Sequence, residues 1–401
     1  MANRILIVQY SASLDGSTVS ALMLADGLRE AGWETHVAFG HEGPMIERFR
    51  DSGHSASVVS HKNWLRANRH GKFVRDVYRE VQTVEVFEQK LRLLRPDLVY
   101  VNTCASLAGA AAAHRYQIPC VWHLRELFVD VGGEMKVPGG VKPWVRSRFF
   151  RYADRLIANS TSVARNLLGV TSYHRALVVP NGVENRFFRH GMTREVARGL
   201  FGLPLEGVVI GIPGTLRPMK GHPFFFRAVQ TLLKEDSTLK VAVTGGGESS
   251  YIEQVRAQVR ALGIEQQVIF LGSIDDMPAF YRACDLVCVP SVAEPFGRII
   301  VEAFASGTPV LATRVGGIPE IIDDGVNGLL VSYGDEHALT ARLCELLQNE
   351  PLRKQLSARA LEKAKREYHE ATYKARICQV VEELINRPAA RDHGRAEVLV
   401  S

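Results

Sequence analysis

Two acidic side chains between residues 285 and 314 have a type and spacing suited to accepting hydrogen bonds from the hydroxyls of one ligand. Glu302 falls in a nearly apolar stretch, residues 296–305, that is expected to be a helix, and Glu294 falls in the turn before it. A carboxylate on a buried helix is costly unless it is paired or hydrogen-bonded. Glu302 is therefore either a core residue bonded to a backbone amide or an arginine, or a residue that accepts hydrogen bonds from a ligand's hydroxyls. We favour the second interpretation, with Glu294 reaching the same ligand.

Two cationic side chains follow a glycine turn after a predicted strand, residues 208–212. Gly214 permits the turn, and Arg217 and Lys220 lie just before a helix that is expected to begin near Pro223. The planar fork of arginine and the point charge of lysine together suit a diphosphate. The Walker A motif is absent from the sequence.

Two further candidates follow predicted strands of the first half. His123 ends one strand, where it serves either a ligand or strand packing. Gly16 follows the first strand and lets backbone approach a ligand, so the amides of Ser17 and Thr18 could point at an anion. A plain helix-capping turn is the alternative for that loop.

Neither a metal nor an organic cofactor is expected. The sequence has no Asp-x-Asp pair and no dinucleotide-binding glycine fingerprint. Its six cysteines are scattered and no histidine or cysteine cluster completes a metal site. We expect free thiols in a reducing cytoplasm.

The predicted elements place these residues at the edges of two sheets. Strands and helices alternate throughout, which predicts α/β architecture with two doubly wound parallel sheets. The strands are expected at residues 4–9, 35–39, 57–60, 97–102, 120–123, 155–158 and 176–179, and at 208–212, 240–244, 268–271, 286–289, 309–312 and 328–331. Ligands of such sheets bind at the carboxyl ends of the strands, so two facing domains would form a cleft. We predict domains at 1–185 and 186–368, a helix at 369–386 and a disordered tail at 387–401.

Length and composition agree with a protein of two domains. The chain has 401 residues, 46% of them hydrophobic and 23% charged. Its formal net charge of +6 favours anionic ligands or surfaces, and no motif indicates nucleic acid. No apolar run is long enough to span a membrane, and no signal peptide is evident, so a cytoplasmic location is expected.

Two segments, residues 61–80 and 136–155, combine basic and aromatic residues. Their aromatic side chains include Trp64, Phe73, Trp144, Phe149 and Phe150. Such segments either lie on an anionic membrane surface or are amphipathic helices whose arginine stems cover the core. The first interpretation predicts a peripheral protein at the inner face of the membrane.

The spacing of Glu294 and Glu302, with seven residues between them, resembles the E-x7-E motif of the retaining glycosyltransferases of family 4. The similarity extends from the first strand to about Val331 and includes the segments VVPNGVE, PGTLRPMKG and VGGIPEIIDDGVNGLLV. The resemblance implies the GT-B fold, two Rossmann-like domains facing across a cleft, with the last helix crossing back to the first domain.

The resemblance also implies roles for the candidate residues. Glu302 would bind ribose hydroxyls, and Glu294 would bind the transferred sugar together with the backbone of Phe296 and Gly297. Arg217 and Lys220 would stabilise the diphosphate, and His123 would lie near the anomeric centre. The remaining substrate-binding positions would be Gly16, Gly214, Arg298 and Ile299. Gly16 departs from the family, which often has a Gly-Gly pair where this chain has Asp15-Gly16-Ser17.

The function implied is transfer of a hexose from a nucleotide diphosphate sugar, without a metal and with retained anomeric configuration. The acceptor would be a hydroxyl of a glycan, of a lipid-linked glycan or of a small molecule. No carboxylate is evidently placed as a nucleophile, so the resemblance favours a front-face route in which the leaving phosphate takes the acceptor proton. An epimerase or hydrolase on the same fold, or a non-catalytic nucleotide-sugar-binding module, is the alternative.

Overall fold

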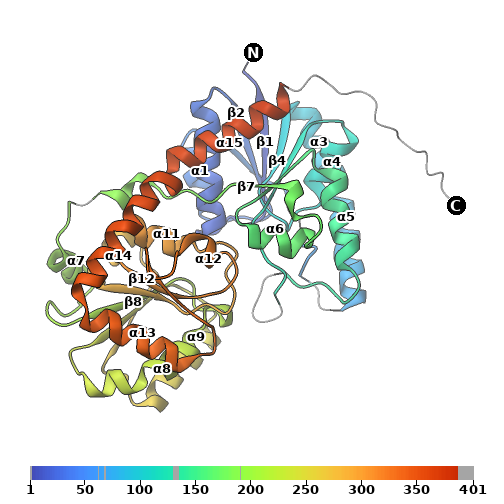
Figure 1. Cartoon of the computed structure of the whole chain (residues 1–401). Coiled ribbons are helices and arrows are strands. Elements are labelled where there is room, and N and C mark those ends of the chain that lie inside the picture. The colour runs from blue at the N-terminus through green and yellow to red at the C-terminus, as the bar shows by residue number, and fades with distance from the viewer. Residues whose placement is uncertain (1, 62, 67–68, 130–134, 190, 387–401) are drawn as a thin grey trace.

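The structure is a computed structural model that describes the chain except for residues 1, 62, 67–68, 130–134, 190 and 387–401. The predicted disordered tail, residues 387–401, lies outside the described residues. Figure 1 shows two α/β units, each with a central sheet, joined by the chain near residue 180 and by the C-terminal helices.

The first sheet has seven parallel strands in the order β3-β2-β1-β4-β5-β6-β7. Ile5 and Ile7 of β1 pack into one apolar cluster, and Leu6 and Val8 pack into another. Alternate side chains therefore bury both faces of the sheet, as parallel sheets covered by helices require. The strands are β1 (Arg4–Gln9), β2 (Glu34–Phe39), β3 (Ser55–Val58), β4 (Leu98–Val101), β5 (Cys120–Leu124), β6 (Arg155–Ala158) and β7 (Ala176–Val178). The helices are α1 (Gly16–Glu30), α2 (Met45–Asp51), α3 (His70–Leu94), α4 (Ala108–Arg115), α5 (Lys142–Tyr152) and α6 (Thr161–Leu168).

The second sheet has six parallel strands in the order β10-β9-β8-β11-β12-β13. These are β8 (Val209–Pro213), β9 (Lys240–Thr244), β10 (Val268–Gly272), β11 (Leu286–Val289), β12 (Val310–Thr313) and β13 (Leu329–Val331). The helices are α7 (Arg194–Leu200), α8 (His222–Glu235), α9 (Ser249–Leu262), α10 (Met277–Ala283), α11 (Arg298–Ala305), α12 (Ile318–Ile321), α13 (Glu336–Gln348) and α14 (Glu350–Lys363). Short 3-10 turns lie at Tyr173–Arg175, Asn185–Phe188 and Pro218–Lys220. The predicted α/β fold of two doubly wound parallel sheets is confirmed.

The last helix, α15 (Glu370–Ile385), lies against α1 of the first unit (Figure 1). A π-helical turn, Ala364–Tyr368, precedes it. Tyr373, Ile377 and Val381 of α15 belong to the same apolar cluster as α1. The chain thus returns from the second sheet to the first. None of the described helices combines the length and apolar character needed to cross a bilayer.

Two predicted boundaries are wrong for local reasons. The strand expected at 57–60 is β3, Ser55–Val58, because pairing with β2 begins at His36 and Ser55 and ends at Phe39 and Val58. The helix expected from residue 296 begins at Arg298, because Gly297 has φ 111°, a left-handed conformation outside the helical range.

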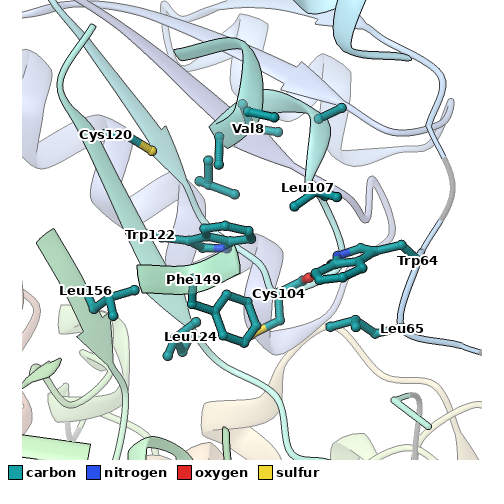
Figure 2. Packing of buried hydrophobic residues seen from close by; sticks show 14 of the residues in the cluster. Val8, Trp64, Leu65, Cys104, Leu107, Cys120, Trp122, Leu124, Phe149 and Leu156 are labelled. Atoms are coloured by element: carbon teal, nitrogen blue, oxygen red, sulfur yellow. Dashed lines mark hydrogen bonds between the residues drawn. The ribbon is translucent and has the colours of Figure 1, made fainter. Parts of the chain in front are cut away.

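The aromatic residues expected at a membrane surface mostly belong to the core. Trp64 and Phe149 are fully buried and Phe73 is 6% exposed. The rings of Trp122 and Phe149 pack edge-to-face with centroids 4.9 Å apart, and Trp64 belongs to the same apolar cluster (Figure 2). Phe73 on α3 and Phe149 on α5 are therefore the inward side chains of amphipathic helices, and Trp64 is buried from the loop before α3, whereas Trp144 is 37% exposed.

Asp285, directly before β11, is expected to stabilise the folded state of the second unit. Its carboxylate accepts hydrogen bonds from the Val209 amide at 2.7 Å and from Arg198 at 2.5 Å, and both side chains are buried. Asp285→Ala should lower the free energy of unfolding by about 3–5 kcal/mol, because it leaves a buried cation unpaired. Urea denaturation followed by circular dichroism measures this.

The matched control is Glu253→Ala, which removes an exposed carboxylate paired with Arg260. Its unfolding midpoint should equal that of the wild type. Equal midpoints for the Asp285 and Glu253 variants would contradict the assignment of Asp285 as a structural anchor.

Candidate functional site

Lys220 and Glu294 form an ion pair between two loops of the second sheet. Lys220 Nζ lies 2.6 Å from Glu294 Oε2, and the side chains are only 18% and 10% exposed. Lys220 belongs to the loop after β8, and Glu294 belongs to the loop after β11. The sequence predicted both residues for one ligand, and the structure brings them into direct contact.

Glycine at position 221 makes this contact possible. Gly221 has φ 73°, and a Cβ atom there would lie 1.9 Å from the Pro290 carbonyl oxygen. The two loops are also joined by a hydrogen bond from the Val292 amide to the Met219 carbonyl at 2.8 Å. A larger residue at 221 would push the lysine loop away from Glu294.

Glu302 has two partners in the described structure. Its Oε2 accepts a hydrogen bond from the Tyr281 hydroxyl at 2.8 Å, and its Oε1 lies 2.7 Å from Arg298 Nε. Burial, and then the Glu302 carboxylate, raise the pKa of Tyr281, so the phenol stays protonated and keeps donating. The arginine partner expected under the core interpretation is therefore present, and a ligand role for Glu302 stays a prediction.

Arg298 extends from α11 to the first unit. Its Nη1 lies 3.3 Å from Ser20 Oγ on α1, and its Nη2 lies 3.2 Å from Glu184 Oε2. A Cβ atom on Gly16 would meet Arg298 Cδ at 3.3 Å. Gly16, Arg298 and Glu302 are thus neighbours, although they lie on facing units.

The loop at Gly16 has a helix cap. Asp15 Oδ1 accepts hydrogen bonds from the amides of Ser17 at 2.9 Å and Thr18 at 3.0 Å. The expectation that these two amides point at an anion is therefore wrong, because the Asp15 side chain already occupies them. The plain capping turn is what the chain forms.

His123 lies in a separate buried network at the end of β5. Its Nδ1 is 2.8 Å from the Tyr100 hydroxyl and 3.1 Å from Arg125 Nη2. Arginine can only donate, so Nδ1 is the acceptor and the neutral ring carries its proton on Nε2. The buried Nε2 has no hydrogen-bond partner among the described residues. Burial, and then Arg125, lower the pKa of His123 well below its usual value.

Arg125 is the centre of that network and was not among the predicted site residues. Its guanidinium donates to Asn102 Oδ1 at 2.8 Å, to Asn181 Oδ1 at 2.5 Å and to the Tyr373 hydroxyl at 2.7 Å. Its place directly after the strand of His123 was a sequence signal for Arg125. Nothing local indicated Tyr373, which comes from α15.

The remaining predicted residues lie around these contacts. Gly214 has φ 114°, and a Cβ there would meet Ile299 Cδ1 at 2.7 Å. Phe296 is 4% exposed and packs on Tyr368 with ring centroids 6.0 Å apart. Arg217 is partly buried and precedes the 3-10 turn that carries Lys220.

Two polar contacts tie the Glu294 loop and α12 to α6 of the first unit. The Ser160 hydroxyl, which caps α6, donates to the Pro295 carbonyl at 2.6 Å. Glu320 accepts hydrogen bonds from the Thr161 and Ser162 amides at 2.7 and 2.8 Å. A carboxylate at the positive end of a helix is favourable. Loops at the carboxyl ends of the two sheets therefore face each other.

Within the described ranges, no group of three or more histidine, cysteine, aspartate or glutamate side chains is arranged to hold a metal ion. The carboxylate of Glu126, beside Arg125, is used structurally: it accepts from the Thr103 hydroxyl at 2.7 Å and from the Cys104 amide at 3.0 Å.

Both halves of the chain match glycosyltransferase family models. Residues 15–182 match the glycosyl transferase 4-like domain, and residues 194–363 match the glycosyl transferases group 1 domain. The first unit is therefore a glycosyl transferase 4-like domain and the second unit is a glycosyl transferases group 1 domain. The fold of the chain is GT-B.

Curated relatives match over part of the chain. D-inositol 3-phosphate glycosyltransferase of Mycolicibacterium smegmatis is 36% identical over 254 residues, 61% of this chain and 57% of that protein. The same-named protein of Acidothermus cellulolyticus is 34% identical over 255 residues, 60% of this chain and 56% of that protein. The chain thus spans little more than half the length of these relatives.

Solved structures share the fold over nearly the whole chain. Anabaena HepE in complex with UDP-glucose has a TM-score of 0.80 at 24% identity, covering 95% of this chain and 100% of that one. Sucrose-phosphate synthase from Thermosynechococcus elongatus has a TM-score of 0.77 at 18% identity, covering 95% of this chain and 99% of that one.

The protonation state of His123 can be tested directly. Nitrogen-15 NMR at pH 7 should show a neutral ring with the proton on Nε2, and Arg125→Met should raise the pKa because the nearby cation is removed. Arg115→Met, on the exposed end of α4, should leave His123 unchanged. A proton on Nδ1 in the wild type would contradict the network.

Buried neutral histidines also predict acid sensitivity. Burial lowers the pKa of His61 and of His222 to about 4. Below about pH 6.5 the unfolded chain takes up protons that the folded chain refuses, so stability should fall from pH 6.5 towards pH 4. Urea midpoints across this range measure the effect. An increase in stability over the same range would contradict it.

Proposed function

We propose that this glycosyltransferase moves a hexose from a nucleotide diphosphate sugar to a hydroxyl acceptor, with retained anomeric configuration and without a metal. The observation that carries the proposal is the contact between Lys220 and Glu294. A cation suited to phosphate and a carboxylate suited to sugar hydroxyls lie side by side at the carboxyl edge of one sheet. A nucleotide diphosphate sugar presents both groups within one molecule.

The donor would lie along the loops of the second sheet. Arg217 and Lys220 would neutralise the diphosphate, Glu294 would hold the sugar, and Glu302 would accept from the ribose hydroxyls. Each carboxylate oxygen has two lone-pair sites, so Glu302 could keep Tyr281 and Arg298 while it binds ribose. The complexes of HepE with UDP and UDP-glucose support a donor of this class.

The protein would supply charge and position. As the bond to the leaving phosphate breaks, negative charge develops on the diphosphate, and Arg217 and Lys220 would stabilise it. These two fixed cations would do the work that a divalent metal does elsewhere, so chelating agents should leave activity intact.

His123 would act as a hydrogen-bond donor near the anomeric centre. Its Nδ1 is engaged by Arg125 and Tyr100, and its Nε2 carries the proton, so the neutral ring has no ready site to accept another. This argues against His123 as a general base. It favours a front-face route in which the leaving phosphate takes the acceptor proton.

The acceptor would enter from the first unit. The names of the curated relatives make D-inositol 3-phosphate the first small-molecule acceptor to test, beside glycans and lipid-linked glycans. Relative movement of the two units about the chain near residue 183 would admit the donor and then close on it.

Substitution of the cations tests the diphosphate assignment. Arg217→Ala and Lys220→Ala should each lower kcat by roughly two to three orders of magnitude, because each removes a preorganised charge. Transfer is assayed by release of the nucleotide diphosphate from a panel of sugar donors.

The matched control is Lys234→Ala, an exposed lysine on α8, which should retain full activity. Thermal melting checks that all variants are folded. Near-wild-type turnover in either variant would remove the assignment. Rapid formation of free sugar or an epimer from donor alone would instead favour the hydrolase or epimerase alternative.

Glu302 gives an independent test of donor binding. Glu302→Gln should weaken the affinity for UDP about 10- to 100-fold by calorimetry, since it removes charged hydrogen bonds to ribose. Glu345→Gln, an exposed carboxylate on α13, should bind UDP as the wild type does. Equal affinities for the two variants would count against a ribose site at Glu302.

A further inference from the structure

One face of α3 exposes apolar side chains to solvent. Val74, Tyr78 and Val81 are 66%, 63% and 46% exposed. Their spacing of four and then three residues places them on one stripe of the helix. Single exposed apolar residues are common, but a stripe over two helical turns indicates a surface that binds a partner.

Between residues 70 and 84 the exposed charges are all positive, and the next exposed carboxylate, Glu85, lies one turn beyond Val81. Lys72, Arg75 and Arg79 are exposed, whereas both carboxylates of residues 70–84, Asp76 and Glu80, are buried. Glu80 faces inward and accepts hydrogen bonds from the first amides of α4. All fifteen residues of this stretch are described. We call six of its exposed residues, Lys72, Val74, Arg75, Tyr78, Arg79 and Val81, the α3 basic face.

The start of α5 adjoins the α3 basic face. The ring of Trp144 lies 5.8 Å from that of Phe73, which is the inward neighbour of Val74 on α3. Arg148 Cζ lies 4.5 Å from the centroid of the Trp144 ring, so a positive charge also lies beside this aromatic residue. In Figure 1, α5 lies on the side of the first sheet away from the second unit.

We propose that the α3 basic face, with Trp144, docks on an anionic lipid bilayer. Cations that attract anionic head groups, beside apolar side chains that enter the interface, are the two features that interfacial helices combine. A nucleic acid would satisfy the cations but would leave the apolar stripe without a partner. The surface differs from the one expected from sequence, because Trp64, Phe73 and Phe149 are buried.

Docking there would bring the bilayer near the carboxyl edge of the first sheet. Trp64, in the loop before α3, donates its Nε1 proton to the carbonyl of Cys104, just after β4. The start of α3 therefore lies at the edge that carries His123. A lipid-linked acceptor would enter from this direction; that consequence, unlike the docking itself, rests on the proposed function.

Co-sedimentation with vesicles tests the proposal. The full chain should bind vesicles that contain phosphatidylglycerol at low salt and should bind pure phosphatidylcholine vesicles weakly. The triple variant Lys72→Gln, Arg75→Gln, Arg79→Gln should lose on the order of a hundredfold in affinity, from three cations near the surface. Binding by the wild type should also fall as salt is raised.

A matched control removes three exposed cations of the second unit, Lys234→Gln, Arg359→Gln and Lys365→Gln. It carries the same net charge as the first triple variant and should bind as the wild type does. A second variant, Tyr78→Gln with Val81→Gln, keeps every cation and should bind several-fold more weakly.

Three results would overturn the inference: no binding of the wild type to anionic vesicles, equal loss in the two triple variants, or equal binding to neutral vesicles. UDP binding by calorimetry, measured on the same samples, tests the donor site separately. A wild type that binds UDP but does not bind anionic vesicles would refute the docking surface and leave the proposed donor site standing.

Discussion

The ion pair between Lys220 and Glu294 fixes the geometry of the candidate site. Both side chains are mostly buried, so each needs the other, and removing one would leave a desolvated charge. The contact is possible because Gly221 lets the lysine loop lie against the Pro290 carbonyl, and because Gly316 lies against the Glu294 carbonyl. Close backbone packing therefore places a cation and an anion where a diphosphate and a sugar would meet.

Polar contacts, rather than an apolar core, hold the facing loops together. Ser160 to Pro295, Glu320 to the start of α6, and Arg298 to Ser20 each join the two units. Such contacts exchange with water at modest cost, which suits units that separate and close. By contrast, α15 is fixed to the first unit through apolar side chains and through the Tyr373 hydroxyl at Arg125. Arg125 thus connects the last helix of the chain to His123.

The sheets were predictable because parallel strands are buried on both faces and appear as short apolar runs. Twelve of the thirteen predicted strands agree within one residue at each end. One of the two partners of Glu302 was also predictable from sequence, since Arg298 lies four residues before it on one helix. The occupied amides of Ser17 and Thr18 follow from Asp15, a common capping residue.

The network at Arg125 and the burial of individual aromatic side chains depend on long-range contacts that no local sequence pattern indicates. Arg125 meets Asn181 and Tyr373, which are 56 and 248 residues away in sequence. The composition of residues 61–80 indicated side chains suited to a membrane surface, but it did not indicate which of them are buried and which are exposed. Phe73 and Val74 are neighbours in the chain, yet one lies in the core and the other is exposed.

A crystal structure of the full chain with a nucleotide diphosphate sugar would test the donor site at Lys220 and Glu294 most directly. We predict diphosphate oxygens within hydrogen-bonding distance of Arg217 and Lys220, ribose hydroxyls at Glu302, and the sugar at Glu294. A donor bound elsewhere, with the contact between Lys220 and Glu294 unchanged and no phosphate beside it, would contradict this donor site.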